Sequence, residues 1–256
     1  MVLTFAGWVL AVTLIPFLAG LPPVLDRAIG DRPLHAMLGL AAGLMVGVAF
    51  LRILPRMFGQ GDSAATLTLG VSFVLLYVLE GLASVHGHSP HDHEHAHGHE
   101  PGDHFASARR IPGPALGALG VHMFLDGLIL APAFAVDAAL GVSAGLAIAA
   151  HKVPGGLATG TILAGTELAR RGRLIGLAAV AGSTAVGALV GMALVDVAGL
   201  LPHLLALAAS TLLFVAVAEL LPELHHGPHK GHVVSGLAAG FGAIVALGAA
   251  LGYVGL

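Results

Sequence analysis

The chain has 256 residues, of which 57% are hydrophobic and 10% are charged, and its formal net charge is −3. A charged fraction this far below the roughly 25% of soluble domains excludes an ordinary soluble protein and indicates an integral membrane protein. The slightly acidic balance excludes a basic nucleic-acid-binding surface, and the lack of cysteine excludes disulfides and thiolate metal sites.

Eight apolar segments are separated by clusters of proline, glycine and charge, and each is long enough to cross a bilayer core of roughly 30 Å as a helix. We expect these helices over 2–21, 34–54, 64–85, 113–136, 139–163, 174–197, 201–222 and 233–255. Their continuous apolar character favours helices over barrel strands, in which apolar and polar residues alternate. The predicted fold is therefore all-α, a single transmembrane domain over residues 1–256.

Two further features bear on how the predicted helices enter the membrane and pack. The first segment has no basic residues before its apolar run and no clear cleavage site, so we expect a retained span and not a signal peptide. The chain contains 37 glycines, which favour close helix packing in lipid and make a homodimer plausible.

Lysine and arginine are distributed unevenly among the predicted loops. With both termini outside, the outer loops hold only Arg52 and Arg56. The cytoplasmic loops then hold Arg27, Arg32, Arg109, Arg110, Arg170, Arg171, Arg173 and Lys230. Because short cytoplasmic loops retain the excess of positive charge, this predicts outside termini, in a bacterial inner membrane or its equivalent.

The second and seventh predicted helices end alike. The run "AFLRILPRM" beginning at Ala49 aligns with "AVAELLPEL" beginning at Ala216, with Pro55 over Pro222. One run is at the outer end of its span and the other at the inner end, which is typical of an inverted repeat. We therefore expect two pseudo-symmetric halves of three helices around a central pair, a 3+2+3 bundle.

The central pair of predicted helices carries residues that suit a metal ion. His122 and Asp126 are four residues apart and so share one face of the fourth helix, and His151 lies in the fifth. Two imidazoles and a carboxylate suit zinc or a neighbouring transition metal. The thioether of Met45, or a backbone carbonyl released by the helix-interior Pro154, would complete a weak and exchangeable shell.

Lys152 also lies inside the fifth predicted span, where an ammonium group is costly and marks a functional site. The alternative is a purely structural network, since a single buried histidine is more often hydrogen-bonded than metal-bound. Four ionisable groups at similar depth on consecutive helices, namely His122, Asp126, His151 and Lys152, favour the metal site.

These residues resemble the motifs of the ZIP (Zrt/Irt-like) metal transporters. The helix-four motif of that family, H-N-x-x-[D/E]-G, is matched by "HMFLDG" beginning at His122, with Met123 in place of asparagine. The helix-five motif, commonly H-E-x-P-H-E, is matched by "HKVPGG" beginning at His151, from which Lys152 and Gly155 depart. The resemblance covers essentially the whole chain and implies eight helices, outside termini and a metal site between helices four and five.

The departures from the family pattern imply a single metal ion where many relatives hold two. The second ion of the family uses the positions taken here by Met123, Lys152 and, in the sixth span, Thr184. We expect the Lys152 ammonium to lie where that ion would sit and to neutralise Asp126. Gly155 removes one further ligand, so the resemblance implies a mononuclear site made of His122, Asp126 and His151, with Met45 as an additional candidate.

A histidine-rich loop over 86–112 separates the third and fourth predicted helices on the cytoplasmic side. Its alternating imidazoles would bind zinc loosely, and we expect them to buffer or sense cytosolic metal, the alternative being a solvated linker whose metal binding is incidental. The candidate buffering residues are His86, His88, His91, His93, His95, His97, His99 and His104.

The sequence thus predicts a transporter, not an enzyme, that moves zinc, or Fe²⁺, Mn²⁺ or Cd²⁺, toward the cytoplasm, with Glu219 as a candidate pathway residue. Nothing matches G-x-x-x-x-G-K-[ST], so we expect a gradient and not ATP to drive transport. Two alternatives remain. One is a metal-binding membrane sensor or degenerate relative without flux. The other is an intramembrane metalloenzyme, which ranks last because the H-E-x-x-H pattern is absent.

Overall fold

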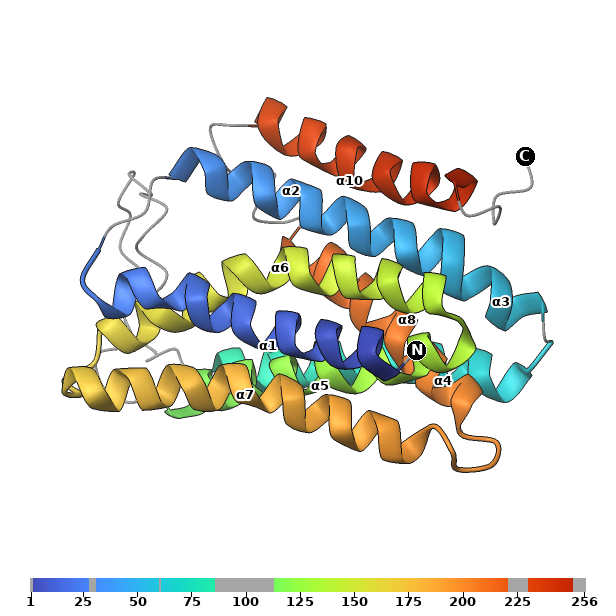
Figure 1. Ribbon diagram of the computed structural model, residues 1–256, viewed down its shortest axis with the longest axis horizontal. Helices are drawn as coiled ribbons and strands as arrows, with labels where there is room; N and C mark the ends of the chain where they lie inside the picture. Colours follow the sequence, from blue (N-terminus) through green and yellow to red (C-terminus); the bar gives the residue numbers. More distant parts are fainter. Residues whose placement is uncertain (1, 28–30, 60, 86–112, 221–229, 251–256) are drawn as a thin grey trace.

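A computed structural model describes residues 2–27, 31–59, 61–85, 113–220 and 230–250, and all regular structure within them is helical (Figure 1). The α-helices are α1 (Val2–Val24), α2 (Asp31–Val48), α3 (Leu54–Gly59), α4 (Ser63–Val85), α5 (Gly113–Val136), α6 (Ala138–Ala164), α7 (Arg170–Leu194), α8 (Leu201–Phe214) and α10 (Lys230–Ala250). Two π-helices, η1 (Ala49–Ile53) and η3 (Val215–Leu220), continue α2 and α8. The all-α prediction is confirmed for this part of the chain.

Six helices of the described part are long and apolar enough to cross a membrane. They cover Leu3–Val24, Ala36–Gly59, Ala115–Val136, Arg170–Leu194, Leu201–Ala218 and Val233–Ala250. The other two predicted spans form α4, whose apolar part is Ser63–Leu79, and α6, which is 27 residues long but carries His151 and Lys152. A polytopic membrane protein is therefore supported, and the count of eight spans stays a prediction.

The second predicted span extends past its expected end at residue 54 to Gly59. Five residues of π-helix, η1, precede α3, and the amide of Leu54 donates to the carbonyl of Ala49 five residues back. The helix continues through Pro55 in this wider turn. In a regular α-helix, Pro55 has no amide hydrogen to donate to the carbonyl four residues earlier, so that carbonyl would lose its hydrogen bond. As a result Arg52 and Arg56, expected in outer loops, belong to helical turns, and Arg52 is buried.

Three of the tightest helix pairs are joined through glycine faces, as the glycine content predicts. A methyl group on Gly127 of α5 would meet the carbonyl oxygen of Thr184 of α7 at 1.9 Å. A methyl group on Gly43 of α2 would lie 2.1 Å from a backbone oxygen of α10, and one on Gly156 of α6 would lie 2.3 Å from a backbone oxygen of α1. The backbones of these helix pairs are therefore in contact. Such close contact strengthens the van der Waals attraction between helices, which matters in lipid because there is no hydrophobic effect to hold the helices together.

The helix pairs follow a symmetrical pattern. The most extensive contacts are α5 with α7, α2 with α10, α1 with α6 and α4 with α8. Exchanging the first three spans with the last three, and α5 with α6, turns α1·α6 into α7·α5 and α2·α10 into α8·α4. Both π-helices also follow the exchange, since η1 continues α2 and η3 continues α8.

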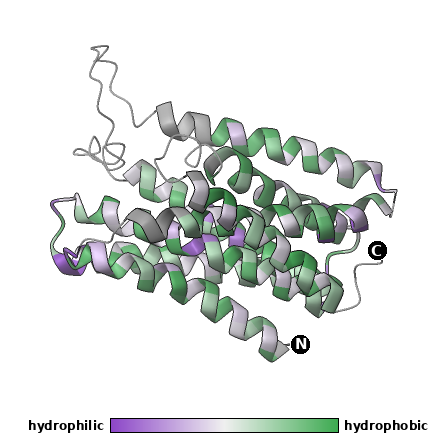
Figure 2. Ribbon diagram, turned by 90° about the horizontal axis from the view of Figure 1, so that it is seen from above, coloured by the Kyte–Doolittle hydropathy of each residue, from purple (hydrophilic) through white to green (hydrophobic). Residues whose placement is uncertain are grey.

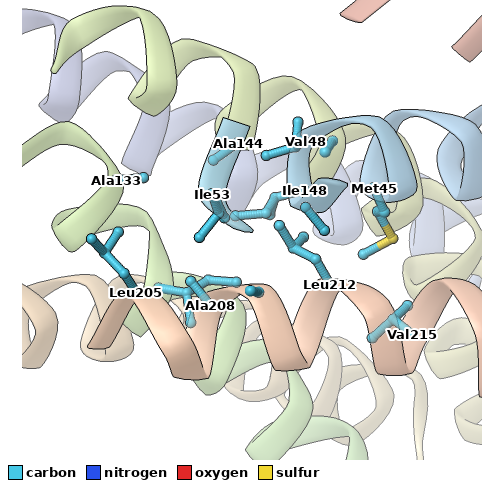
Figure 3. Close-up of a cluster of buried hydrophobic side chains, with 14 of the residues drawn as sticks. Met45, Val48, Ile53, Ala133, Ala144, Ile148, Leu205, Ala208, Leu212 and Val215 are labelled. Carbon is cyan, nitrogen blue, oxygen red and sulfur yellow. The ribbon is translucent and has the colours of Figure 1, made fainter. Parts of the chain in front are cut away.

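A hydrophobic cluster fills the bundle where α2, α5, α6 and α8 meet (Figure 3). Ile53 extends from η1, Ile148 from α6 and Leu212 from α8, and each is almost fully buried. The lipid-facing surfaces are hydrophobic too, so hydrophilic colour gathers at the helix ends and in the interior of the bundle (Figure 2). Polar residues inside such a bundle therefore need a specific partner or a function.

Gly187→Ala on α7 is expected to destabilise the fold by about 1–3 kcal/mol, because the added methyl group overpacks the helix contact. That methyl group would lie 1.9 Å from the carbonyl oxygen of Phe124 on α5. Gly182→Ala is the matched control on the same helix, since its methyl group meets nothing within 4 Å. Thermal unfolding in detergent measures both; equal melting temperatures for the two variants would contradict the close α5–α7 contact.

Candidate metal site

The predicted metal ligands converge inside the bundle between α5 and α6. His122 and Asp126 lie one turn apart on α5, and His151 lies on the adjacent α6. One ligand atom from each residue lies within 4.8 Å of the others, and within the described part this is the single group of three such residues. The two imidazole rings meet edge to face with centroids 5.6 Å apart. The three side chains expected to share a site therefore lie close together, and their role as metal ligands stays a prediction.

One oxygen of Asp126 receives most of the contacts. Its Oδ2 lies 3.0 Å from Nε2 of His151 and 3.5 Å from Nε2 of His122. Its Oδ1 is buried and has no hydrogen-bond partner within the described part of the chain. A buried carboxylate oxygen without a partner is costly, so this oxygen is available to a group outside the described part of the chain, such as a metal ion.

The orientation of His151 is compatible with a metal ion between this ring and Asp126. Its Nδ1 lies 3.2 Å from the carbonyl oxygen of Ala147, which can only accept a hydrogen bond. The neutral ring that donates from Nδ1 to Ala147 presents a bare Nε2 lone pair to Asp126 Oδ2, itself an acceptor. Two acceptors this close need a proton or a metal ion to satisfy both. Ala147, missed in the sequence, orients the ring; in the tautomer that donates from Nδ1 to this carbonyl, Nε2 is free to bind a metal ion.

Lys152 fills the neighbouring position. Its Nζ lies 2.9 Å from Asp126 Oδ2 and donates to Thr184 Oγ1 at 2.9 Å. It also lies 2.8 Å from the sulfur and 3.4 Å from the carbonyl oxygen of Met123. Met123 and Thr184, which the family resemblance places with Lys152 at the second-metal positions, thus both contact the ammonium group. A methyl group on Gly155 would lie 3.1 Å from Met123 Cε, so the glycine leaves a small space beside this cluster.

Burial within the site is uneven. Asp126 and Lys152 have no exposed surface and His151 is 4% exposed. The His122 side chain is 20% exposed and is thus the accessible member of the site. The neighbouring α5 residue Val121 is 57% exposed, whereas the part of α5 beyond Asp126 is packed in the hydrophobic cluster. His122 is therefore the member of the site that lies nearest the surface of the described part.

Met45 is buried, but it belongs to the hydrophobic cluster, together with Ile148, Leu212 and Val215 (Figure 3). The structure surrounds its thioether with apolar side chains, which the spacing along the sequence does not indicate. The backbone of Glu219 lies in η3, and its side chain is outside the described part. The histidine-rich loop, with all of its candidate buffering residues, also lies outside the described residues.

A second polar cluster at the far end of α6 has no counterpart in the sequence-based site. Arg52 of η1 donates from Nη2 to Ser143 of α6 at 3.3 Å, and Arg56 of α3 forms an ion pair with Asp137. The other oxygen of Asp137 accepts from the amide of Leu140 at 2.7 Å and so caps α6. The helix that carries His151 is thereby tied to η1 and α3.

Comparisons with known proteins identify similar sequences over most of the chain. A family model described as "ZIP Zinc transporter" matches residues 86–248, more than half of the chain. The zinc transporter ZIPB of Bordetella bronchiseptica is 34% identical over 237 residues, which cover 88% of this chain and 74% of that protein. Both similarities include α5 and α6, on which the candidate ligands lie.

Proposed function

Because the chain belongs to the ZIP zinc transporter family, we propose that it carries a divalent transition metal, with zinc as the expected substrate, toward the cytoplasm. The observation that carries this proposal is the convergence of His122, Asp126 and His151 from two helices inside an apolar bundle. Imidazole and carboxylate ligands suit Zn²⁺, and also Fe²⁺, Mn²⁺ or Cd²⁺ with different preference.

The proposed site is mononuclear. Lys152 directs its ammonium group at Asp126 and is surrounded by Thr184 and Met123, so a cation already occupies the second-metal position. A second metal ion there would face a like charge at low dielectric, which is strongly unfavourable. Met45 would act as a ligand only in a conformation that opens the hydrophobic cluster, and Glu219 stays a candidate pathway residue.

The symmetrical helix pairing supports the 3+2+3 inverted repeat within an eight-span bundle. The paired π-helices at the ends of α2 and α8 support it further, because these are the two runs that align in the sequence. With both termini outside, as the arginine distribution predicts, the hydrophobic cluster lies on the outer side of the site. His122 then faces the cytoplasmic half, so this conformation corresponds to a passage closed to the outside.

The function is tested by zinc uptake into proteoliposomes containing the wild type or the His122→Ala variant. We expect zinc uptake in the wild type and a reduction of about tenfold or more in the variant. Mutating even a residue that only contacts a metal ligand lowers metal affinity about 10–100-fold. Ser183→Ala is the control, because this α7 hydroxyl bonds to the backbone of Gly120 and Val180 and not to the site. Uptake unchanged by His122→Ala would contradict the proposal.

The same assay separates the two other classes. A sensor without flux would bind zinc and show no uptake in any proteoliposome preparation. An intramembrane metalloenzyme would likewise show no uptake and would hydrolyse a substrate only when loaded with metal. The altered helix-five motif is the feature that favours the sensor, and zinc-dependent uptake by the wild type rejects both.

The loop over 86–112 is proposed to buffer or sense metal on the cytoplasmic side. Deleting residues 86–104 removes the candidate buffering histidines but leaves the helices that carry the site. We therefore expect zinc uptake to persist while its dependence on internal zinc concentration changes. Uptake measured in proteoliposomes preloaded with graded zinc tests this, and complete loss of transport would contradict a buffering role.

A further inference from the structure

The charge of the proposed site is unusual for one that receives a dication. Among the described side chains that contact one another there, Asp126 and Lys152 form an ion pair of one negative and one positive charge, and an imidazole binds a metal ion as a neutral ligand. The two charges cancel before the metal arrives. A divalent ion would then add its full double charge to a site where Asp126 and Lys152 are completely buried, which is costly in low dielectric.

The ligand count is also short by one. His122, Asp126 and His151 supply three ligands, whereas zinc generally takes four. Gly155, one turn beyond His151, offers no side chain, and a methyl group at this position would meet only the flexible end of Met123 within 4 Å. Met45 lies in the hydrophobic cluster, and the Met123 sulfur contacts Lys152, so neither thioether is assigned to the shell in this conformation.

The site is less enclosed on one side than on the others. His122 is its partly exposed member, and Asp126 Oδ1 is directed toward no hydrogen-bond donor of the described chain. The Lys152 ammonium contacts the same carboxylate oxygen as the ligand atoms of both histidines, so its charge would lie beside a metal ion held by these atoms. At this range a fixed cation attracts an anion into the coordination shell.

We propose that a small inorganic anion such as chloride binds as the fourth ligand of the metal, and that Lys152 is the residue that makes this anion necessary. The proposal rests on the proposed function and specifies how its site reaches charge and coordination balance. The loaded site would carry a single net positive charge in place of two, because the anion takes the compensating role of the carboxylate that Lys152 replaces in the family motif.

Zinc-edge X-ray absorption on the purified full chain, loaded with one equivalent of zinc, tests the proposal directly. In bromide buffer we expect a heavy scatterer in the first shell, together with imidazole nitrogen and carboxylate oxygen. Bromide is used because its scattering differs clearly from that of nitrogen and oxygen. A first shell of only nitrogen and oxygen atoms would mean that water or a further side chain completes the site, and would overturn the proposal.

Zinc affinity provides the second readout, measured in chloride and in weakly coordinating nitrate. We expect the wild type to bind zinc about tenfold more tightly in chloride than in nitrate, because a change of this size follows the loss of one interaction around a bound metal ion. Lys152→Met, which keeps the length of the side chain but not its charge, is expected to lose this anion dependence, whereas Ser183→Ala keeps it. An equal anion dependence in Lys152→Met would overturn the role of the lysine.

The two levels of the account are distinguishable in these measurements. Equal zinc affinity in chloride and in nitrate would contradict the anion proposal, but the proposed metal site would stand. A lack of zinc binding in both buffers would contradict the metal site itself, and therefore also the anion proposal. If Lys152→Met does not fold, the absorption spectrum of the wild type in bromide decides the proposal alone.

Discussion

Asp126→Asn is expected to abolish high-affinity zinc binding, with a loss of about 100-fold or more. Asp126 is contacted by both histidines and by Lys152 through one oxygen, so it is the residue that joins the two ligand helices. The amide of asparagine is neutral and presents donors as well as an acceptor, so it is a poor metal ligand. Zinc titration of the purified protein, with uptake measured in parallel, checks the effect.

The same substitution leaves the Lys152 ammonium buried without its counter-charge, which is expected to destabilise the fold by about 3–5 kcal/mol. Combining Asp126→Asn with Lys152→Met restores charge balance and is expected to recover much of this stability without recovering zinc binding. A double variant that binds zinc like the wild type would show that Asp126 is a structural partner of Lys152 and not a ligand.

Lys152→Asp, made in a chain from which the histidine-rich residues 86–104 are deleted, is expected to raise the zinc stoichiometry from one to two ions per chain. The substitution removes the ammonium beside Asp126 and introduces a carboxylate next to Thr184 Oγ1 and the carbonyl oxygen of Met123, which the lysine contacts now. Oxygen ligands around a vacated cation position favour a second metal. Equilibrium dialysis followed by metal analysis measures the change.

Lys152→Met in the same deleted chain is the matched control for stoichiometry, because it removes the charge and adds no oxygen ligand. We expect one ion per chain in this control, as in the deleted chain that keeps Lys152. If Lys152→Asp also holds a single ion, then Lys152 does not occupy a latent metal position, and the mononuclear site needs another explanation.

The helical fold could be predicted from the sequence because an apolar run of about 20 residues is long enough to cross a bilayer as a helix. α5, α6 and α7 lie within a few residues of the predicted spans, and the Asp137 cap places the start of α6 one residue before the expected one. The extension of the second span to Gly59 could not be predicted, since Pro55 normally marks a helix end. The π-turn that accommodates it depends on contacts with α8 and α2.

The candidate site was predictable in part for similar reasons. The spacing of His122 and Asp126 fixes their common face, and the cost of polar groups inside a membrane span singles out His151 and Lys152. Their convergence depends on the approach of α5 to α6, which no local pattern encodes. The burial of Arg52 against Ser143 has the same origin, because the surroundings of a charge at a helix end depend on which helices pack there.

The central claim is that one metal ion binds between His122, Asp126 and His151. Crystals of the purified protein soaked in zinc, with diffraction data collected at the zinc absorption edge, test it most directly. The account predicts one anomalous peak per chain in the membrane interior, within bonding distance of Nε2 of both histidines and of an Asp126 oxygen. A site without a peak, in crystals whose histidine-rich loop or other surface positions are loaded, would contradict it.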